Sequence, residues 1–145
     1  MNVKMKVSSI LVLFIIVVSC ATTQTTAPEK PSNLPAKYNL DDDLKELNQI
    51  AAVKKSDFEE VDNQSVILKA NRGEYYLLVL REPIDPLISK QRTMGLESSE
   101  STVPSGIGRI YMKHSSGTQY YVIEKIYRLK GRKQAEEIKE RLRNS

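Results

Sequence analysis

The sequence predicts a mainly β, α+β fold: a small antiparallel sheet of about five strands, curled or partly closed into a barrel, with a short N-terminal helix and a C-terminal helix. Two turn signals support this prediction, Asn71-Arg72-Gly73 and Ser115-Ser116-Gly117, each flanked by strand-like segments. The third observation is a spacing of three between Ile123, Ile126 and Leu129, which a strand satisfies only if it bends or bulges.

The N-terminal helix is predicted over residues 40–53. Leu40, Leu44, Leu47 and Ile50 recur at helical spacing, and Asp41 precedes them as a possible N-cap. We expect this helix to cover one end of the core.

The first hairpin is predicted over residues 65–81, around Asn71-Arg72-Gly73. The segment Tyr75–Leu80 is apolar on both faces, which is typical of a central strand covered on both sides. Residues 92–98 (RTMGLES) form a short third strand in this interpretation, and residues 98–108 (SSESTVPSGIG) form a loop.

The second hairpin is predicted over residues 109–129, with a bulge or strong bend near Glu124-Lys125. Gly131 then ends the strand. Residues 132–145 follow as a charged helix, whose narrow apolar face consists of Ala135, Ile138 and Leu142.

The first twenty residues have the layout of a secretory signal peptide, with two lysines, a short apolar run and a small residue. The apolar run is too short to span a bilayer, which takes about 20 residues. Val17-Val18-Ser19-Cys20 resembles the lipobox of bacterial lipoproteins. That resemblance implies that a diacylglycerol is attached to the Cys20 sulfur, that cleavage precedes Cys20, and that the new amino terminus is acylated.

The chain therefore divides into a signal peptide (1–19), a lipidated cysteine with a flexible tether (20–37) and a single extracytoplasmic domain (38–145). The tether is rich in Thr, Pro and polar residues, a composition that cannot bury enough apolar surface to fold. Two or three acyl chains would anchor the protein stably in a membrane. Ala21 is not the Asp that resembles an inner-membrane retention signal. We therefore expect an outer-membrane location facing the periplasm if the organism is Gram-negative.

Composition argues against several function classes. The formal net charge of +4 falls to +2 once Lys4 and Lys6 leave with the signal peptide, so the basic pI does not indicate nucleic-acid binding. His114 is the only histidine, and no second histidine or free cysteine exists to supply a zinc set. The serines, such as Ser98, Ser99 and Ser101, lack a glycine-flanked nucleophile elbow, so we expect no nucleophile–base pair. We expect no cofactor and no enzymatic activity.

A second resemblance covers about residues 57–130. Tyr76, Leu77 and Leu80, and later Ile123, Ile126 and Leu129, look like the core strands of a family of uncharacterised bacterial lipoproteins and secreted proteins. Ile84 and Tyr121 stand where that family has two cysteines. The resemblance implies that apolar packing replaces a structural disulfide here, and it implies no activity.

One group of side chains could form a binding face. Tyrosines and basic residues interleave on the predicted strands, as protein interfaces and sugar-binding surfaces often show. The candidate residues are Tyr75, Arg109, Tyr111, Lys113, Tyr120 and Arg128. The leading hypothesis is a domain that binds an envelope protein or supports an assembly. The alternative is a module for cell-wall glycan or another envelope polymer. A third interpretation, that half of the tyrosines are core or barrel rim, stays open.

Overall fold

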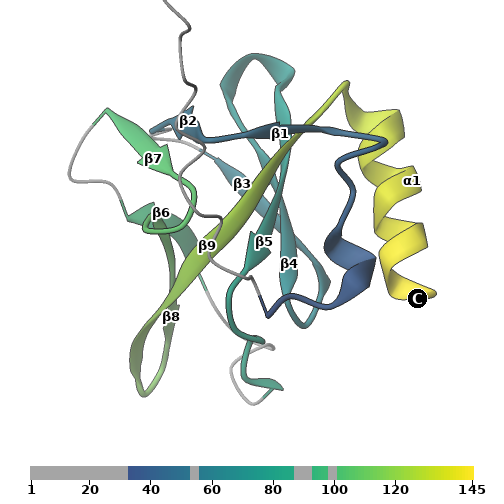
Figure 1. Cartoon of the computed structure of the whole chain (residues 1–145). Helices are drawn as coiled ribbons and strands as arrows, with labels where there is room; N and C mark the ends of the chain where they lie inside the picture. Colours follow the sequence, from purple (N-terminus) through teal and green to yellow (C-terminus); the bar gives the residue numbers. More distant parts are fainter. Residues whose placement is uncertain (1–32, 53–55, 87–92, 98–100) are drawn as a thin grey trace, which may run out of the picture.

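The computed structural model describes residues 33–52, 56–86, 93–97 and 101–145, which form a curled antiparallel sheet with one α-helix on its outer side (Figure 1). In chain order the elements are η1 (Ala36–Tyr38), β1 (Lys45–Leu47), β2 (Gln49–Ala51), β3 (Asp57–Asp62), β4 (Ser65–Lys69), η2 (Asn71–Gly73), β5 (Tyr75–Leu80), β6 (Thr93–Glu97), β7 (Thr102–Pro104), β8 (Arg109–His114), β9 (Gly117–Leu129) and α1 (Arg132–Arg143).

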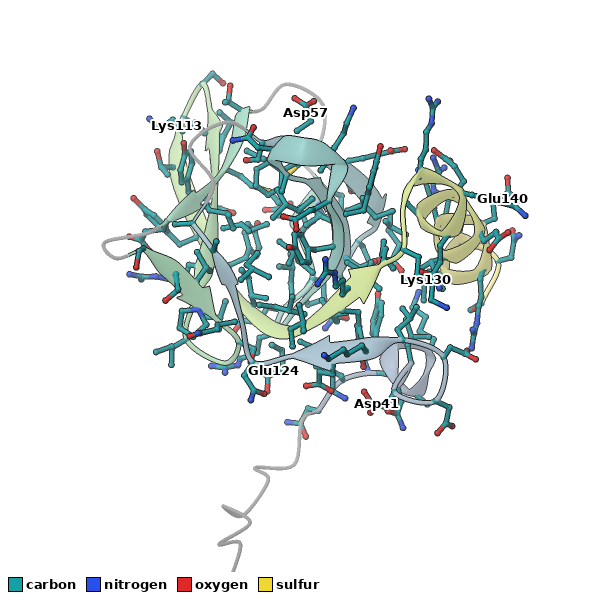
Figure 2. All side chains as sticks on the ribbon, turned by 90° about the horizontal axis from the view of Figure 1, so that it is seen from above. Asp41, Asp57, Lys113, Glu124, Lys130 and Glu140 are labelled. Carbon is teal, nitrogen blue, oxygen red and sulfur yellow. The ribbon has the colours of Figure 1, made fainter. Side chains whose placement is uncertain are left out.

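The main sheet is organised around β9, which is 13 residues long. Its strand order is β3-β4-β5-β9-β8-β6, and β1 pairs with β9 beside this path. The C-terminal half of β9 pairs with β5 and β1, and its N-terminal half pairs with β8. A view from above shows the strands curling around a side-chain interior, which gives the sheet the form of a half-barrel (Figure 2). A separate two-stranded ribbon consists of β2 and β7.

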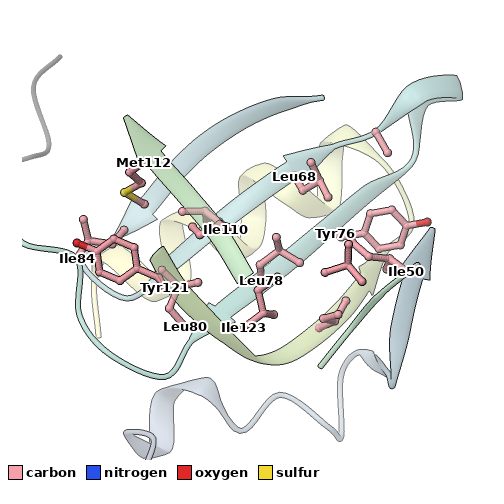
Figure 3. Packing of buried hydrophobic residues seen from close by; sticks show 14 residues of the cluster. Ile50, Leu68, Tyr76, Leu78, Leu80, Ile84, Ile110, Met112, Tyr121 and Ile123 are labelled. Atoms are coloured by element: carbon pink, nitrogen blue, oxygen red, sulfur yellow. The ribbon is translucent and has the colours of Figure 1, made fainter. Parts of the chain in front are cut away.

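The inner core fills the concave side of the half-barrel (Figure 3). It draws apolar side chains from nearly every strand and includes Leu68, Leu78, Ile110, Met112 and Ile123, each at or near zero exposure. Burial of this kind contributes roughly 1.5–3 kcal/mol for each large side chain. The inner core is therefore the main source of stability for the curl.

The outer core lies on the convex side of β3, β4, β5 and β9, under α1 and the chain that precedes β1. Leu77, Val79 and Tyr127 contribute from the sheet, and Tyr38 and Leu40 come from the N-terminal side. The predicted apolar face of α1, Ala135, Ile138 and Leu142, is confirmed as the buried face of this helix. The prediction that Tyr75–Leu80 is a central strand covered on both sides is also confirmed, because β5 supplies both cores.

The predicted bulge near Glu124-Lys125 is present. Val79 pairs with Lys125 whereas Leu80 pairs with Ile123, so Glu124 is the extra residue on β9. Both predicted hairpins are confirmed as well, β4–β5 and β8–β9. In the first turn Gly73 takes a φ of 76°, a conformation that favours glycine.

The helix predicted over residues 40–53 is wrong. Leu44 donates its amide hydrogen to Leu40 O at 2.8 Å, which makes a single helical turn, and the chain then extends as β1 and β2. Leu40 and Leu44 enter the outer core, but Ile50 enters the inner core. The helical spacing thus reflects apolar contacts with two cores on opposite sides of the sheet rather than one helical face.

The strand count of about five is too low. The sheet has seven strands among the described residues, and β2 and β7 add the ribbon. Two segments account for much of the difference: the mistaken helix supplies β1 and β2, and the predicted loop contains β7, whose Val103 pairs with Ile50. Residues 98–100 of that loop lie outside the described residues. The short third strand is confirmed as β6.

Candidate functional site

Four of the six candidate binding residues lie together on the convex surface of β8 and β9. In the β8–β9 ladder Tyr111 is opposite Tyr120, and the neighbouring rows place Arg109 opposite Val122 and Lys113 opposite Thr118. The alternating residues of β8 point the other way into the inner core. We call Arg109, Tyr111, Lys113 and Tyr120 the tyrosine face.

The tyrosine face is held by two cation–π contacts. The Arg109 guanidinium carbon lies 5.3 Å from the centroid of the Tyr120 ring, and Lys113 Nζ lies 5.4 Å from that of Tyr111. Such contacts are worth about 0.5–1 kcal/mol at exposed sites. Arg109 Nε also forms an ion pair with Glu97 on β6 at 2.5 Å. The rings and cations are thus arranged before any ligand binds.

The two tyrosines of this face differ in what they can do. Tyr111 lies over Gly95 of β6, where an added Cβ would come within 2.3 Å of the Tyr111 ring. This half-buried ring therefore packs on β6, the last strand in the sheet order. Tyr120 is 51 % exposed, although it is a large apolar side chain. Tyr120, with Arg109 beside it, is the ring that a partner could contact.

Tyr75 and Arg128, the other two candidates, lie elsewhere. Tyr75 packs beside the outer core close to α1. Arg128 pairs across the ladder with Tyr76, a residue of the inner core, and its guanidinium lies 3.6 Å from Glu74. The bulge at Glu124 separates Arg128 from Tyr120, because it reverses which residues of β9 face outward.

Sequence reasoning missed a polar cluster at the bulge. Lys125 Nζ lies 3.1 Å from carboxylate oxygens of both Asp41 and Glu46 and 3.3 Å from the hydroxyl of Tyr127. Burial alone would lower the pKa of Lys125, but the hydrogen bonds with Asp41, Tyr127 and Glu46 outweigh it and raise the pKa. The signal in the sequence was the charged pair Glu124-Lys125 between the apolar residues Ile123 and Ile126.

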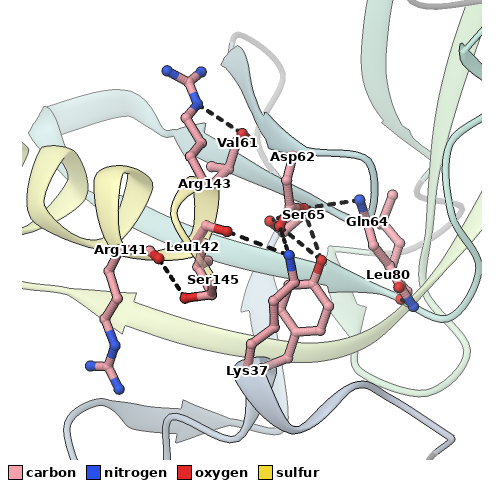
Figure 4. Close-up of polar contacts among 11 residues, drawn as sticks. Lys37, Val61, Asp62, Gln64, Ser65, Leu80, Arg141, Leu142, Arg143 and Ser145 are labelled. Carbon is pink, nitrogen blue, oxygen red and sulfur yellow. Dashed lines mark hydrogen bonds and ion pairs between the residues drawn. The ribbon is translucent and has the colours of Figure 1, made fainter.

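A second polar cluster surrounds Asp62 (Figure 4). Its carboxylate accepts hydrogen bonds from Lys37 Nζ at 2.8 Å, the Tyr38 hydroxyl at 2.9 Å and Ser65 Oγ at 2.7 Å. It also accepts one from the backbone amide of Gln64 at 3.0 Å. Burial would raise the pKa of Asp62, yet these donors, Lys37 foremost, lower it below the ordinary value.

Both polar clusters fasten the chain that leads into the domain. Residues 34–44, which we call the N-terminal arm, include Leu34, a side chain packed against the outer core. Residues 34–37 were assigned to the tether by composition, but Lys37 and Leu34 contact the folded domain. In both clusters carboxylates, ammonium groups and hydroxyls pair with one another between the arm and the sheet, and these contacts hold the arm in place.

His114 is the last residue of β8, next to the turn that joins β8 to β9. Its Nδ1 lies 2.8 Å from Ser116 Oγ, and its Nε2 is buried with no hydrogen-bond partner among the described residues. Within the same residues, no group of three or more His, Cys, Asp or Glu side chains is arranged to hold a metal ion.

The chain matches a family of unknown function, DUF6491, over residues 3–145. It belongs to this family. No curated protein and no solved structure matches the chain. The match agrees with the resemblance to an uncharacterised family. In this DUF6491 protein Ile84 and Tyr121, the two positions that the resemblance aligned with cysteines, are both buried in the inner core (Figure 3). The Asp85 amide donates to the Tyr121 hydroxyl at 3.3 Å.

The predicted lipidation site of this DUF6491 protein, Cys20, lies outside the described residues. Among the residues that are described, no helix is long and apolar enough to cross a membrane.

Proposed function

We propose that this DUF6491 protein is a lipid-anchored protein of the bacterial envelope whose domain binds another envelope protein through the tyrosine face. It is not an enzyme in this proposal. The observation that carries the proposal is the exposed ring of Tyr120, held beside Arg109 on the β8–β9 hairpin.

The anchor part of the proposal rests on the N-terminal sequence. A positive start, a short apolar run, Ser19 and then Cys20 fit a lipoprotein leader. The acyl chains on Cys20 would hold the protein in the outer membrane, facing the periplasm if the organism is Gram-negative. From Cys20 to the docked Leu34 the tether spans fourteen residues in sequence, roughly 20 Å on average for a flexible chain. The domain would therefore stay close to the membrane surface.

The binding part of the proposal rests on energetics at interfaces. Tyr and Arg are enriched among residues that dominate binding energy, because each buries a large area and retains a polar group. The cation–π contact limits the motion of Tyr120 and Arg109 before binding, which lowers the entropy that binding must cost. Glu97 balances the charge of Arg109, so the net positive charge of the tyrosine face comes from Lys113.

A photo-crosslinking residue at position 120 tests the proposal directly. The full-length chain with p-benzoylphenylalanine in place of Tyr120 would be irradiated in intact cells, and its adducts identified by mass spectrometry. The matched control carries the same group at Lys133, a side chain that is 94 % exposed on the far side of α1. We expect a dominant protein adduct from position 120 that is absent from position 133. Equal adducts from both positions would contradict a specific face.

A glycan-binding module is the second candidate, favoured by the flat exposed ring of Tyr120, which can also stack on a sugar. The chain without its leader, with Cys20→Ser, would be sedimented with purified peptidoglycan. Retention that Tyr120→Ala abolishes, without any protein adduct in cells, would replace the protein-binding proposal with this one.

A further inference from the structure

A cavity of about 400 Å³ opens between the first turns of α1 and the neighbouring ends of β3, β4 and β5. This volume falls in the range of small-ligand sites, roughly 300–1,000 Å³. Ile67 and Ala135 supply apolar walls, and Tyr75, Lys69 and Arg132 stand around them. We call this cavity the α1 groove.

The sheet register explains how these residues meet. Asp57, Lys69 and Tyr75 form one row across β3, β4 and β5, and Glu59 and Ile67 belong to a neighbouring row. These residues share the convex side with the outer core. Helix α1 crosses that side and brings Ala135 and Arg132 over the row.

The charges of the α1 groove are unevenly satisfied. Lys139 is only 13 % exposed in its side chain and forms ion pairs with both Glu59 and Glu136. One ammonium thus offsets only one of these two carboxylates, and Asp57, opposite Lys69, is a third carboxylate of the groove wall. By contrast, neither Lys69 nor Arg132 is in an ion pair with a residue that the structure describes.

We propose that the α1 groove binds a carboxylate attached to an apolar group. Lys69 and Arg132 would bind the carboxylate, with the hydroxyl of Tyr75 as a further donor, and the apolar group would pack on Ile67 and Ala135. Arg and Lys recognise carboxylates through charge-assisted hydrogen bonds, which are stronger than neutral ones. Two sources carry this chemistry: the C-terminal residue of a peptide and a free aliphatic acid.

This groove is distinct from the tyrosine face. It lies at the β3–β5 side of the sheet under α1, whereas the tyrosine face belongs to β8 and β9. Its occupancy therefore does not depend on the proposed protein partner, and either proposal can fail alone.

The test uses the full-length lipidated chain in detergent, with methyl labels on Ile and Ala. Three compounds are titrated: N-acetyl-Ala-Leu with a free carboxylate, its C-terminal amide, and 4-methylpentanoate. We expect saturable shifts of the Ile67 and Ala135 methyl signals with a carboxylate compound and none with the amide. Binding of the peptide acid alone would assign the site to peptide ends, and equal binding of 4-methylpentanoate would assign it to free acids.

Two variants test the cations. Lys69→Gln and Arg132→Gln should each weaken binding by about tenfold or more, as expected for the loss of one charge-assisted contact. Lys133→Gln is the matched control, because it removes a neighbouring charge on α1 that does not line the groove. The dispersion of the remaining methyl signals shows whether each variant is folded. Equal binding of acid and amide, or no binding of either acid, would overturn the proposal.

Discussion

Ile123 and Ile126 enter the same core although they are three positions apart on one strand. Regular strand geometry would place them on opposite faces. The extra residue at Glu124 resolves this, because the partner of Lys125 is Val79 and that of Ile123 is the next residue, Leu80. Because of the bulge, β9 contributes side chains to the inner core on both sides of Glu124. It also places Lys125 on the convex side, where it pairs with the N-terminal arm.

Deletion of Glu124 should therefore be far more harmful than loss of its side chain. Removing the residue forces either Ile123 or Ile126 out of the inner core, at a cost of about 2–5 kcal/mol for one buried aliphatic side chain. Glu124→Ala removes only a partly exposed ion pair with Arg81, worth less than about 1 kcal/mol. Urea unfolding of the two variants compares them. Similar losses in both would mean that the bulge has no role in core register.

The sequence predicted the parts of the fold that depend on neighbours along the chain. Turn residues with tolerance for positive φ located both hairpins, and the three-residue spacing located the bulge. The prediction from the sequence failed where one segment contributes side chains to both cores. Leu44 and Ile50 look like one helical face, but their partners lie on opposite sides of the sheet. Such contacts involve residues distant in sequence and override local helix propensity.

The six candidate binding residues do not all lie on one face, for the same reason. Tyr120 and Arg128 are an even number of residues apart, so alternation places them on one face. The bulge between them reverses that relation, so Arg128 and Tyr120 lie on opposite faces of the sheet. Tyr75 faces α1. The sequence could not predict this, because β5 is covered on both sides and nothing in the local sequence distinguishes its two faces.

The Tyr111 ring fits against Gly95 because glycine has no side chain, and substitution of either residue tests this packing. Gly95→Ala places a methyl group against the Tyr111 ring and should destabilise the protein by about 1–3 kcal/mol. Tyr111→Ala should weaken the packing of β8 against β6 and speed amide hydrogen exchange in Thr93–Glu97. Tyr120→Ala is the control, because this exposed ring gives up only its cation–π contact with Arg109: the free energy of unfolding should fall by less than about 1 kcal/mol, and exchange in β6 should be unchanged. Faster β6 exchange in Tyr120→Ala than in Tyr111→Ala would contradict this assignment.

Stability at acid pH should depend on Asp62. Its pKa is lowered in the folded protein, so the folded state binds this proton less readily than the unfolded chain. The contribution of Asp62 is thus complete above the unfolded pKa of about 4 and is lost as the pH falls through the lower folded value. Asp62→Asn should cost about 1–3 kcal/mol at pH 7 and flatten the acid limb of a plot of unfolding free energy against pH.

Asp42→Asn is the control for that experiment. Asp42 is exposed, and it should change neither the stability at pH 7 nor the acid limb measurably. If the acid limb of Asp62→Asn matched that of the unaltered chain, the cluster around Asp62 would not be what stabilises the arm near neutral pH.

Loss of Cys20 should release the protein from the membrane. In the described residues the large apolar side chains are mostly buried in the two cores, and Ile107 and Tyr120 are the exposed ones. Two isolated side chains cannot replace acyl chains, which contribute about 0.8 kcal/mol per buried methylene.

The choice of variant matters, because an uncleaved leader would itself hold a Cys20→Ala chain in the membrane. The cleaner variant therefore joins residues 21–145 to a secretory leader that is removed without lipidation. We expect this chain in the soluble envelope fraction and the unaltered chain in the detergent-extracted membrane fraction, with the acyl mass on Cys20 by mass spectrometry. A processed, unacylated chain that still sediments firmly with membranes would show that something other than lipid on Cys20 holds the domain there.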